Sequence, residues 1–189
     1  MSDLRIGIIL GSTRPGRKGD QVAKWVLEQA SKRDSATYEL VDLSDFNLPH
    51  LDEAIPSSQG IYANEHTKVW SAKIASLDGF IFVTPEYNHS YSPALKNAID
   101  FLHLEWWRKP VGFVSYGGVS AGTRGVVALE PVVIGVGMVR TGANVELPFG
   151  GAQVADGVFT PQEKESAILL KELAELDRLA DALRPLQNR

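Results

Sequence analysis

The stretch ILGSTRPGRKGDQVAKWV (residues 9–26) joins the end of an apolar run to a loop and then to a helical pattern. The run that it completes, LRIGIIL (4–10), has the length of a strand and is apolar at nearly every position. After the loop, apolar residues recur three and four positions apart, which is the spacing of a helix with one buried face. Strands that are apolar on both sides are typical of parallel sheets covered by helices on both faces. This stretch therefore predicts an α/β fold.

The rest of the chain repeats this alternation of strand and helix. Further apolar runs of strand length are TYELVDL (37–43), GFIFVT (79–84), PVGFVSY (110–116) and ANVEL (143–147). Helical patterns cover 20–33, 64–77, 93–104 and 125–139, and a last helix is predicted to start with Thr160 as N-cap, Pro161 and Glu163. We expect a three-layer, doubly wound α/β domain over residues 1–189, whose five-stranded parallel sheet has the order 2-1-3-4-5.

The composition of the chain limits the classes of function. Its 189 residues are 44% hydrophobic and carry a formal net charge of −4, so one core can form and the basic excess of a nucleic-acid-binding protein is missing. Without cysteine there are no disulfides, thiolate nucleophiles or cysteine-ligated metals, and the histidines share no ligand spacing, so no metal site is expected. The N-terminal run is predicted as a strand rather than a signal peptide, and no run reaches the ~20 residues of a membrane span. We expect a cytoplasmic protein without membrane contact.

Three loops are expected at the ligand-binding edge of the sheet. In doubly wound sheets, ligands bind beyond the carboxyl ends of the strands, at the point where the strand order reverses between strands 1 and 3. This rule selects the loops 11–19, 85–92 and 115–124. Cationic, aromatic, amide and glycine residues are concentrated in these loops, so each is a candidate for ligand contacts.

The first loop, GSTRPGRKG (11–19), suits a terminal phosphate. It has neither the Lys-Ser/Thr pair of a nucleoside-triphosphate loop nor the Gly-x-Gly-x-x-Gly pattern of dinucleotide-binding proteins. Ser12 offers a hydroxyl, Arg14 and Arg17 offer planar donors, and the loop ends at a helix N-terminus whose amides point outward. The alternative is a solvated basic turn in which Ser12 only caps the helix.

The second and third loops suit a flat ring. The second, TPEYNHSYSPALKNAID (84–100), carries aromatic and amide side chains that fit a heteroaromatic ligand. Alternatively, Tyr87 and Tyr91 pack at a contact between subunits. In the third, SYGGVSAGTRG (115–125), glycines let the backbone approach a ligand closely and Arg124 supplies a cation. The alternative there is that the glycines serve only a tight turn.

Three motifs of the chain resemble those of the NAD(P)H-dependent FMN reductase family, a branch of the flavodoxin-like fold. The motifs are GSTRPGRKG (11–19), PEYNHSYSPALKNAIDFL (85–102) and KPVGFVSYGGVSAGTR (109–124), with a weaker similarity in LPHLDEAIP (48–56). The middle motif is the most specific of them. The family includes flavin, quinone, azo-dye and chromate reductases, which are usually dimeric or tetrameric.

The resemblance implies a flavin-binding site with three parts. The FMN phosphate would be held by Ser12, Arg14 and the turn of Arg17, Lys18 and Gly19. Pro85, Glu86, Tyr87 and Asn88 would line the isoalloxazine edge, and Tyr116, Gly117 and Gly118 would lie against its other side. Arg124 matches an arginine that works near the flavin at the subunit interface of some members, which makes it a candidate for contacts with NAD(P)H. Many members carry Ser and Asn where this chain has Arg17 and Gly19, so the phosphate-binding loop of this chain is more cationic.

The resemblance also implies an oxidoreductase in which flavin N5 does the chemistry and no side chain is catalytic. Hydride would pass from NADPH or NADH to FMN, and electrons then to a small acceptor such as free flavin, a quinone, an azo compound or a metal oxyanion. A single exposed ring face would make donor and acceptor alternate in a ping-pong mechanism. The alternative is a flavodoxin-type electron carrier without NAD(P)H oxidase activity, a class that is usually more acidic than this chain. A flavin-binding module without turnover and a phosphosugar or nucleotide hydrolase are further alternatives.

Two helices and one loop are candidates for contacts between subunits. The helix predicted at 125–139 is apolar on nearly every side, although Pro131 should kink it. Together with the helix at 93–104 it predicts a homodimer or a dimer of dimers, and burial inside one domain is the alternative. The loop PFGGAQVADGVF (148–159) leaves the last strand at the ligand-binding edge. It is therefore either a cover for the flavin, a contact with the partner subunit or a plain linker.

Overall fold

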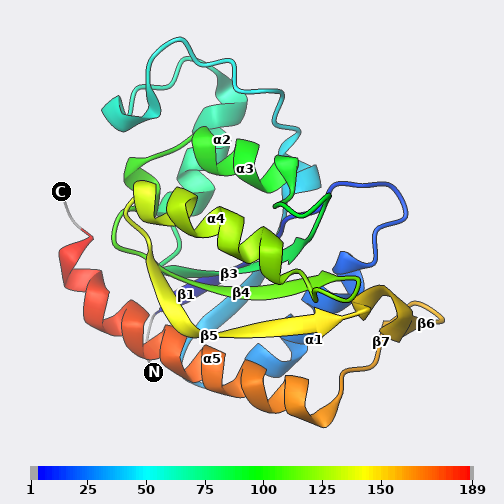
Figure 1. The fold of residues 1–189 in the computed structure, drawn as a ribbon. Coiled ribbons are helices and arrows are strands. Elements are labelled where there is room, and N and C mark those ends of the chain that lie inside the picture. The colour runs from blue at the N-terminus through cyan, green and yellow to red at the C-terminus, as the bar shows by residue number, and fades with distance from the viewer. Residues whose placement is uncertain (1–3, 188–189) are drawn as a thin grey trace.

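Five parallel strands form the central sheet of the structure, a computed structural model that describes residues 4–187 (Figure 1). The strands are β1 (Arg5–Leu10), β2 (Thr37–Asp42), β3 (Gly79–Pro85), β4 (Pro110–Gly117) and β5 (Val139–Pro148). Their order is β2-β1-β3-β4-β5, which confirms the predicted doubly wound α/β fold. The predicted domain 1–189 also includes residues 1–3 and 188–189, which lie outside the described residues.

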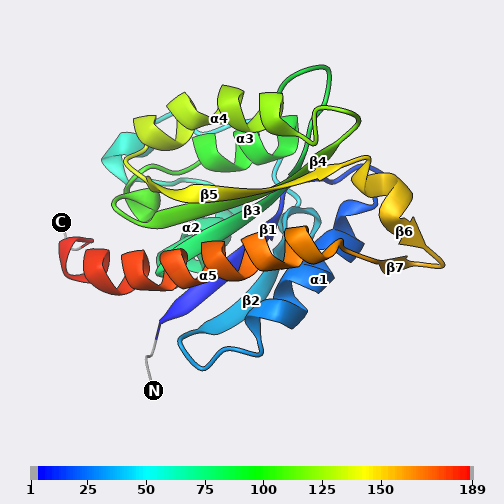
Figure 2. The ribbon, with the colours of Figure 1, turned by 60° about the horizontal axis from the view of Figure 1, so that its bottom comes forward.

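Helices cover both faces of the sheet (Figure 2). One face packs on α1 (Gly19–Ala30) and α5 (Glu163–Leu183), and the other on α2 (Glu65–Ala75), α3 (Pro93–Asp100) and α4 (Thr123–Gly135). Because successive side chains of a strand point to opposite faces, Ile8 and Leu10 join the core beside α1 and α5, while Ile9 joins the opposite core. This two-sided burial explains the continuous apolar runs. Among residues 4–187, none of the helices combines the length and the apolar character that crossing a membrane requires.

Three elements begin or end four residues away from their predicted bounds, whereas the others differ by three residues or fewer. β5 begins at Val139 rather than at 143, because an irregularity in its pairing with β4 interrupts the apolar pattern. The helix predicted at 93–104 ends at Asp100, and the helix predicted at 125–139 ends at Gly135 with Pro131 inside it. In both cases apolar residues continue past the helix into the core, so the hydrophobic pattern alone does not mark the last turn.

The predicted start of α5 is wrong by two residues. The N-cap is Gln162, and the capping box pairs Gln162 with Glu165 instead of Thr160 with Glu163. The amide of Thr160 donates to the carbonyl of Gln153 at 3.0 Å. This bond keeps Thr160 in the extended segment that precedes the helix, so Thr160 is not available as a cap.

Residues 148–159 form a packed hairpin rather than a plain linker. A 3-10 turn (Gly150–Gln153) leads into β6 (Val154–Ala155), which pairs antiparallel with β7 (Val158–Phe159). The Phe159 ring lies 5.1 Å from the ring of Trp25 in α1, which anchors the hairpin to the domain. The segment leaves Gly151 at the ligand-binding edge.

Candidate functional site

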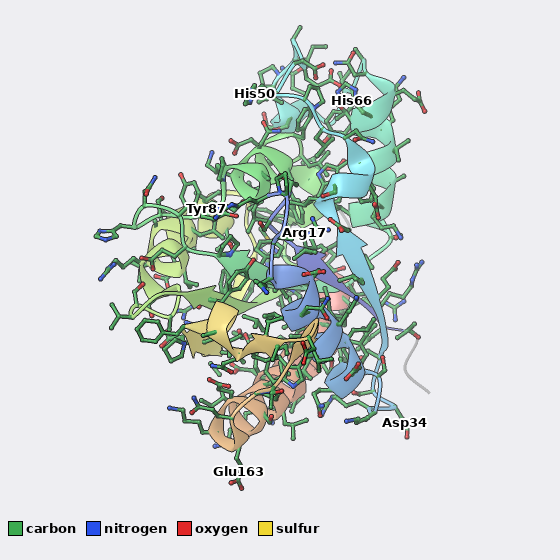
Figure 3. All side chains as sticks on the ribbon, turned by 90° about the vertical axis from the view of Figure 1, so that its right-hand side faces the viewer. Arg17, Asp34, His50, His66, Tyr87 and Glu163 are labelled. Carbon is green, nitrogen blue, oxygen red and sulfur yellow. The ribbon has the colours of Figure 1, made fainter. Side chains whose placement is uncertain are left out.

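The carboxyl ends of β1, β3 and β4 bring the three loops selected from the sequence to one edge of the sheet, which faces the viewer in Figure 3. A cleft of about 390 Å³ lies between these loops. It is lined by residues 14–18 of the first loop, 85–87 of the second and 116–118 of the third, and by Gly151. The three loops therefore share one cavity, which we call the central cleft.

The first loop ends in an open helix N-terminus. Lys18 is the N-cap of α1, and its side chain does not cap the helix. Amides at a helix N-terminus attract anions, because they carry the positive end of the helix dipole. Arg14 and Lys18 are exposed, and within residues 4–187 their charged groups have no hydrogen-bond or ion-pair partner. This end of the central cleft can therefore hold a phosphate.

The guanidinium of Arg17 contacts other groups of the protein, whereas the resemblance implied a contact with the phosphate. Its guanidinium forms an ion pair with Asp42 and donates to the Ser44 hydroxyl at 2.7 Å. It also donates to the Ser12 carbonyl at 2.6 Å. Because Asp42 is the last residue of β2, Arg17 ties the first loop to the neighbouring strand. Arg17 therefore supports the loop, and since it also lines the central cleft, its contact with the phosphate stays a prediction.

The hydroxyls of Ser12 and Tyr87 connect the first loop with the second. The two oxygens lie 2.8 Å apart, and Ser12 is buried. A second tie runs between the same loops, because the Ser92 hydroxyl donates to the Gly11 carbonyl at 2.5 Å. Figure 3 shows Tyr87 and Arg17 near one another at this edge, and both line the central cleft. The walls of the cleft are thus fixed relative to each other.

Tyr116 lies deeper than the resemblance implied. Only 9% of the residue is exposed, and a Cβ atom added at Gly19 would lie 2.2 Å from the Tyr116 hydroxyl oxygen. The tyrosine therefore supports the start of α1, and because it also lines the central cleft, its contact with the isoalloxazine stays a prediction. Glycine at position 19 is required by this close approach. Burial raises the pKa of Tyr116 above its ordinary value of 10.0, so its hydroxyl stays protonated into the alkaline range.

The second loop contains a tight turn with open backbone amides. The amide of Tyr87 donates to the Ser90 carbonyl at 2.9 Å, and the amide of Ser90 donates back at 3.0 Å. Between them, Asn88 and His89 have φ angles of 49° and 66°, in the left-handed region. Within residues 4–187 the amides of Asn88 and His89 have no hydrogen-bond partner. They are available to the polar edge of a ligand.

Glu86 and Arg124, two separately expected site residues, form one ion pair. The Glu86 side chain is only 6% exposed, and it accepts bonds from the Arg124 amide at 3.2 Å and from the guanidinium at 3.1 Å. Burial raises the pKa of Glu86, but hydrogen bonds from Ser120 and Arg124 and the charge of Arg124 outweigh burial and lower it. The carboxylate therefore anchors the N-terminus of α4, and because Glu86 also lines the central cleft, its place at the ring edge stays a prediction.

Two residues at this edge were not expected from the sequence. Asp42 holds Arg17 in place, and Gly151 lines the central cleft from the hairpin. The position of Asp42 at the carboxyl end of a predicted strand could have indicated it, since ligand sites gather there. Gly151 offers no side chain, so its role depends on the packing of the hairpin alone.

The chain matches known reductases in sequence. The family described as NADPH-dependent FMN reductase matches residues 4–151. An NAD(P)H-dependent FMN reductase of a Nectria species is 35% identical over 195 residues, which cover 97% of this chain and 94% of that protein. An NAD(P)H-dependent FMN reductase of Schizosaccharomyces pombe is 47% identical over 120 residues, which cover 62% of this chain. That match spans only 60% of the length of the S. pombe protein.

Solved structures share the fold at lower identity. FerB of Paracoccus denitrificans, a flavoenzyme NAD(P)H:(acceptor) oxidoreductase, has a TM-score of 0.76 at 20% identity, over 95% of this chain and 98% of that chain. An NAD(P)H:quinone oxidoreductase of Methanothermobacter marburgensis has a TM-score of 0.61 at 17% identity, over 98% of this chain and 100% of that chain. These likenesses concern the fold, which is flavodoxin-like.

Proposed function

Because the chain belongs to the NADPH-dependent FMN reductase family, we propose that it moves electrons from NAD(P)H through FMN to a small planar acceptor. The observation that carries this proposal is the central cleft. It lies between the uncapped N-terminus of α1 and the two loops that follow β3 and β4. A helix N-terminus suits the FMN phosphate, and open amides suit the polar edge of the isoalloxazine. The donor set of the cleft therefore fits FMN.

We assign the residues of the cleft to the two ends of FMN. Arg14 and Lys18 would bind the phosphate together with the first amides of α1. The ring would lie between the turn that follows Pro85 and the backbone of the third loop. The supporting residues are Ser12, Arg17, Gly19 and Tyr116 below the phosphate, and Glu86, Tyr87, Gly117 and Gly118 around the ring. Asn88 lines the adjoining cavity of about 780 Å³, from which its amide would reach the ring edge.

The work of the protein in this reaction is binding and orientation. FMN, when bound, supplies the redox chemistry, since it takes a hydride from NAD(P)H and passes two electrons to the acceptor. The amides of Asn88 and His89 would favour negative charge at the ring edge, and as fixed dipoles they need little reorganisation. With a quinone as acceptor, the quinone, NAD(P)H and one proton become hydroquinone and NAD(P)⁺. Water supplies that proton, so no side chain need act as an acid.

We propose a ping-pong order for donor and acceptor. The central cleft is closed by the sheet and α1 on its inner side, so both substrates would use the same open side in turn. Initial rates measured at several concentrations of NADPH and menadione should give parallel double-reciprocal lines. Intersecting lines would contradict the order, and a failure to turn over NADPH and NADH with flavin, quinone, azo and chromate acceptors would instead favour a flavodoxin-type carrier.

We also propose that two chains associate through α3 and α4 as a homodimer, or as a dimer of dimers. α4 leaves Val127 58% and Ile134 66% exposed, although both side chains are large and apolar. Such a face suits contact with a second copy of the chain. Light scattering should give at least twice the mass of the 20.6 kDa chain. Substitution of Val127 and Ile134 by Lys should yield monomers, and a monomeric wild-type protein would contradict the proposal.

A further inference from the structure

The hairpin of residues 148–159 forms part of the wall at the phosphate end of the central cleft. Gly151 lines the cleft, and a Cβ atom added at Gly151 would lie 4.0 Å from the Cγ atom of Lys18, which belongs to the first loop. Figures 1 and 2 show the hairpin, in gold, beyond the end of the sheet and next to α1. This part of the wall therefore comes from a segment at the margin of the domain.

The hairpin has a small attachment to the rest of the domain. β6 and β7 pair over two residues each, and residues 155–158 are exposed. At the start of the hairpin, the amide of Phe149 donates to the Gly118 carbonyl at 3.1 Å. At its end, the buried ring of Phe159 packs on the ring of Trp25 in α1. Segments with few buried contacts open at a low cost in free energy. The contact between Trp25 and Phe159 therefore decides how firmly the hairpin lies on α1.

Three features oppose this closed position of the hairpin. The Nε1 atom of Trp25 and the Oε1 atom of Gln153 are buried, and within residues 4–187 neither has a hydrogen-bond partner. A buried polar atom without a partner destabilises the arrangement that buries it. Phe149 has a φ angle of 51°, in the left-handed region that is unfavourable for a bulky residue. Movement of the hairpin away from α1 would let water reach both polar atoms, which offsets part of the lost apolar contact.

We propose that the hairpin 148–159 is a lid on the phosphate end of the central cleft, and that the contact between Trp25 and Phe159 holds it closed. The inference rests on the proposed function, because the lid controls the exchange of FMN at the same site. FMN enters and leaves while the lid is open, and it is retained while the lid is closed. The reaction with NAD(P)H takes place at the ring end and needs no opening. The Trp25–Phe159 contact therefore sets how long FMN stays on the protein.

The experiment measures both rate constants of FMN exchange. Stopped-flow quenching of flavin fluorescence gives the association rate constant, and dilution of the FMN-loaded protein gives the dissociation rate constant. A lid that opens equally often with and without FMN slows both steps by the same factor and leaves the Kd unchanged. We expect Phe159→Ala to raise both rate constants about five-fold or more, because the aromatic contact that holds the lid is lost. The Kd of FMN should change by less than about two-fold, since binding with the lid open is not altered.

Two further variants complete the test. Phe159→Leu keeps an apolar side chain, so both rate constants should lie between those of the wild type and Phe159→Ala, and this variant serves alone if Phe159→Ala does not fold. The matched control is Val158→Ala, at a 62% exposed position of the same strand, which should keep both rate constants within about two-fold.

The two rate constants also separate the lid from other roles of the hairpin. Dissociation that becomes faster while association stays the same would make the hairpin a fixed wall in contact with FMN and would overturn the inference. Wild-type rates in the Phe159 variants would overturn it as well. If the wild-type protein binds no FMN, or if NADPH does not reduce the bound flavin, the proposed function fails. If both occur and the Phe159 variants exchange FMN at wild-type rates, only the lid fails.

Discussion

The hydroxyl oxygen of Tyr87 lies 2.8 Å from that of Ser12, which joins the loop after β3 to the loop after β1. The first of these residues belongs to the proposed ring end of the FMN site and the second to its phosphate end. Their hydrogen bond links the two ends of the proposed site through protein groups alone, so the fold itself sets the distance between them. A site that is already shaped spends less binding free energy on ordering its walls. Binding of FMN should therefore depend on this pair, although neither hydroxyl need touch the ring.

Removal of the Tyr87 hydroxyl should weaken FMN binding. We expect Tyr87→Phe to raise the Kd of FMN by about two- to ten-fold, which corresponds to the ~0.5–1.5 kcal/mol of one hydrogen bond. Quenching of flavin fluorescence on titration measures this Kd. Ser12→Ala should have a similar effect, and the double variant should be little worse than either single one. Full additivity of the two effects would show that the hydroxyls act independently.

Arg14 and Arg17 should behave differently when changed to Ala. Within residues 4–187 the guanidinium of Arg14 has no partner, so we expect its loss to raise the Kd of FMN ten-fold or more, since a hydrogen bond to a charged group contributes ~1.5–3 kcal/mol. Arg17 is paired with Asp42, so Arg17→Ala should lower the melting temperature as well as FMN affinity. Isothermal titration and thermal unfolding of the apoprotein separate the two effects. An Arg17 variant with normal stability and the larger loss of affinity would restore Arg17 as a direct phosphate ligand.

The Glu86–Arg124 pair should tune the reduction potential of bound FMN. Arg124→Ala leaves the Glu86 carboxylate without its cation near the proposed ring site, which disfavours the extra negative charge of reduced flavin. We expect a shift of roughly 10–30 mV to more negative potential, where 30 mV equals 1.4 kcal/mol for two electrons. Glu86→Gln keeps the cation and should shift the potential in the opposite direction. Anaerobic redox titration with a reference dye measures both, and shifts of the same sign would contradict this account.

Glu172 should make the stability of the fold depend on pH. Its side chain is fully buried on α5, where one oxygen accepts a bond from the Phe113 amide at 2.6 Å, and burial raises its pKa from 4.5 to about 8. The folded protein holds this proton more tightly than the unfolded chain does. The protonated Glu172 therefore makes its full contribution to the free energy of unfolding below pH 4.5, and this contribution is lost as the pH rises toward 8. We expect the free energy of unfolding to fall by at least ~1.4 kcal/mol between pH 5 and about pH 8, the equivalent of one pKa unit.

The Glu172→Gln variant tests the source of that dependence. It cannot titrate, so its urea unfolding curves should change less between pH 5 and pH 8 than those of the wild type. Glu163→Gln, at an exposed position in the first turn of the same helix, is the matched control and should keep the wild-type slope. An unchanged slope in the Glu172 variant would assign the pH dependence to other groups.

The fold and the position of the site follow closely from the sequence. Apolar runs mark all five strands because both faces of the sheet are covered, and the rule for ligand sites in doubly wound sheets selects the loops that line the central cleft. Boundaries are less well marked. The cap of α5 shifts from Thr160 to Gln162 because a hydrogen bond to Gln153 extends the preceding hairpin, and that bond depends on how the hairpin folds back.

Side-chain roles within the loops could not be predicted from the sequence, because their partners lie far along the chain. Arg17 has the local features of a phosphate ligand, but Asp42 at the end of β2 engages it. Tyr116 lies at the carboxyl end of β4 next to the glycines expected at the ring, yet its hydroxyl is directed toward Gly19. In each case a charge or a hydroxyl in a loop indicates that something is bound, and only the packing of distant elements decides whether the partner is ligand or protein.

The anaerobic absorbance spectrum of FMN-loaded protein, recorded before and after addition of NADPH, tests the central claim most directly. We expect flavin to bind in the central cleft and the visible absorbance of oxidised flavin to bleach at a catalytic rate ~1 s⁻¹ or faster. The same measurement on Arg14→Ala at saturating FMN should show bleaching as well, since that residue is assigned to binding. Bound flavin that stays oxidised with both NADPH and NADH would contradict the account, and so would a protein that binds no FMN.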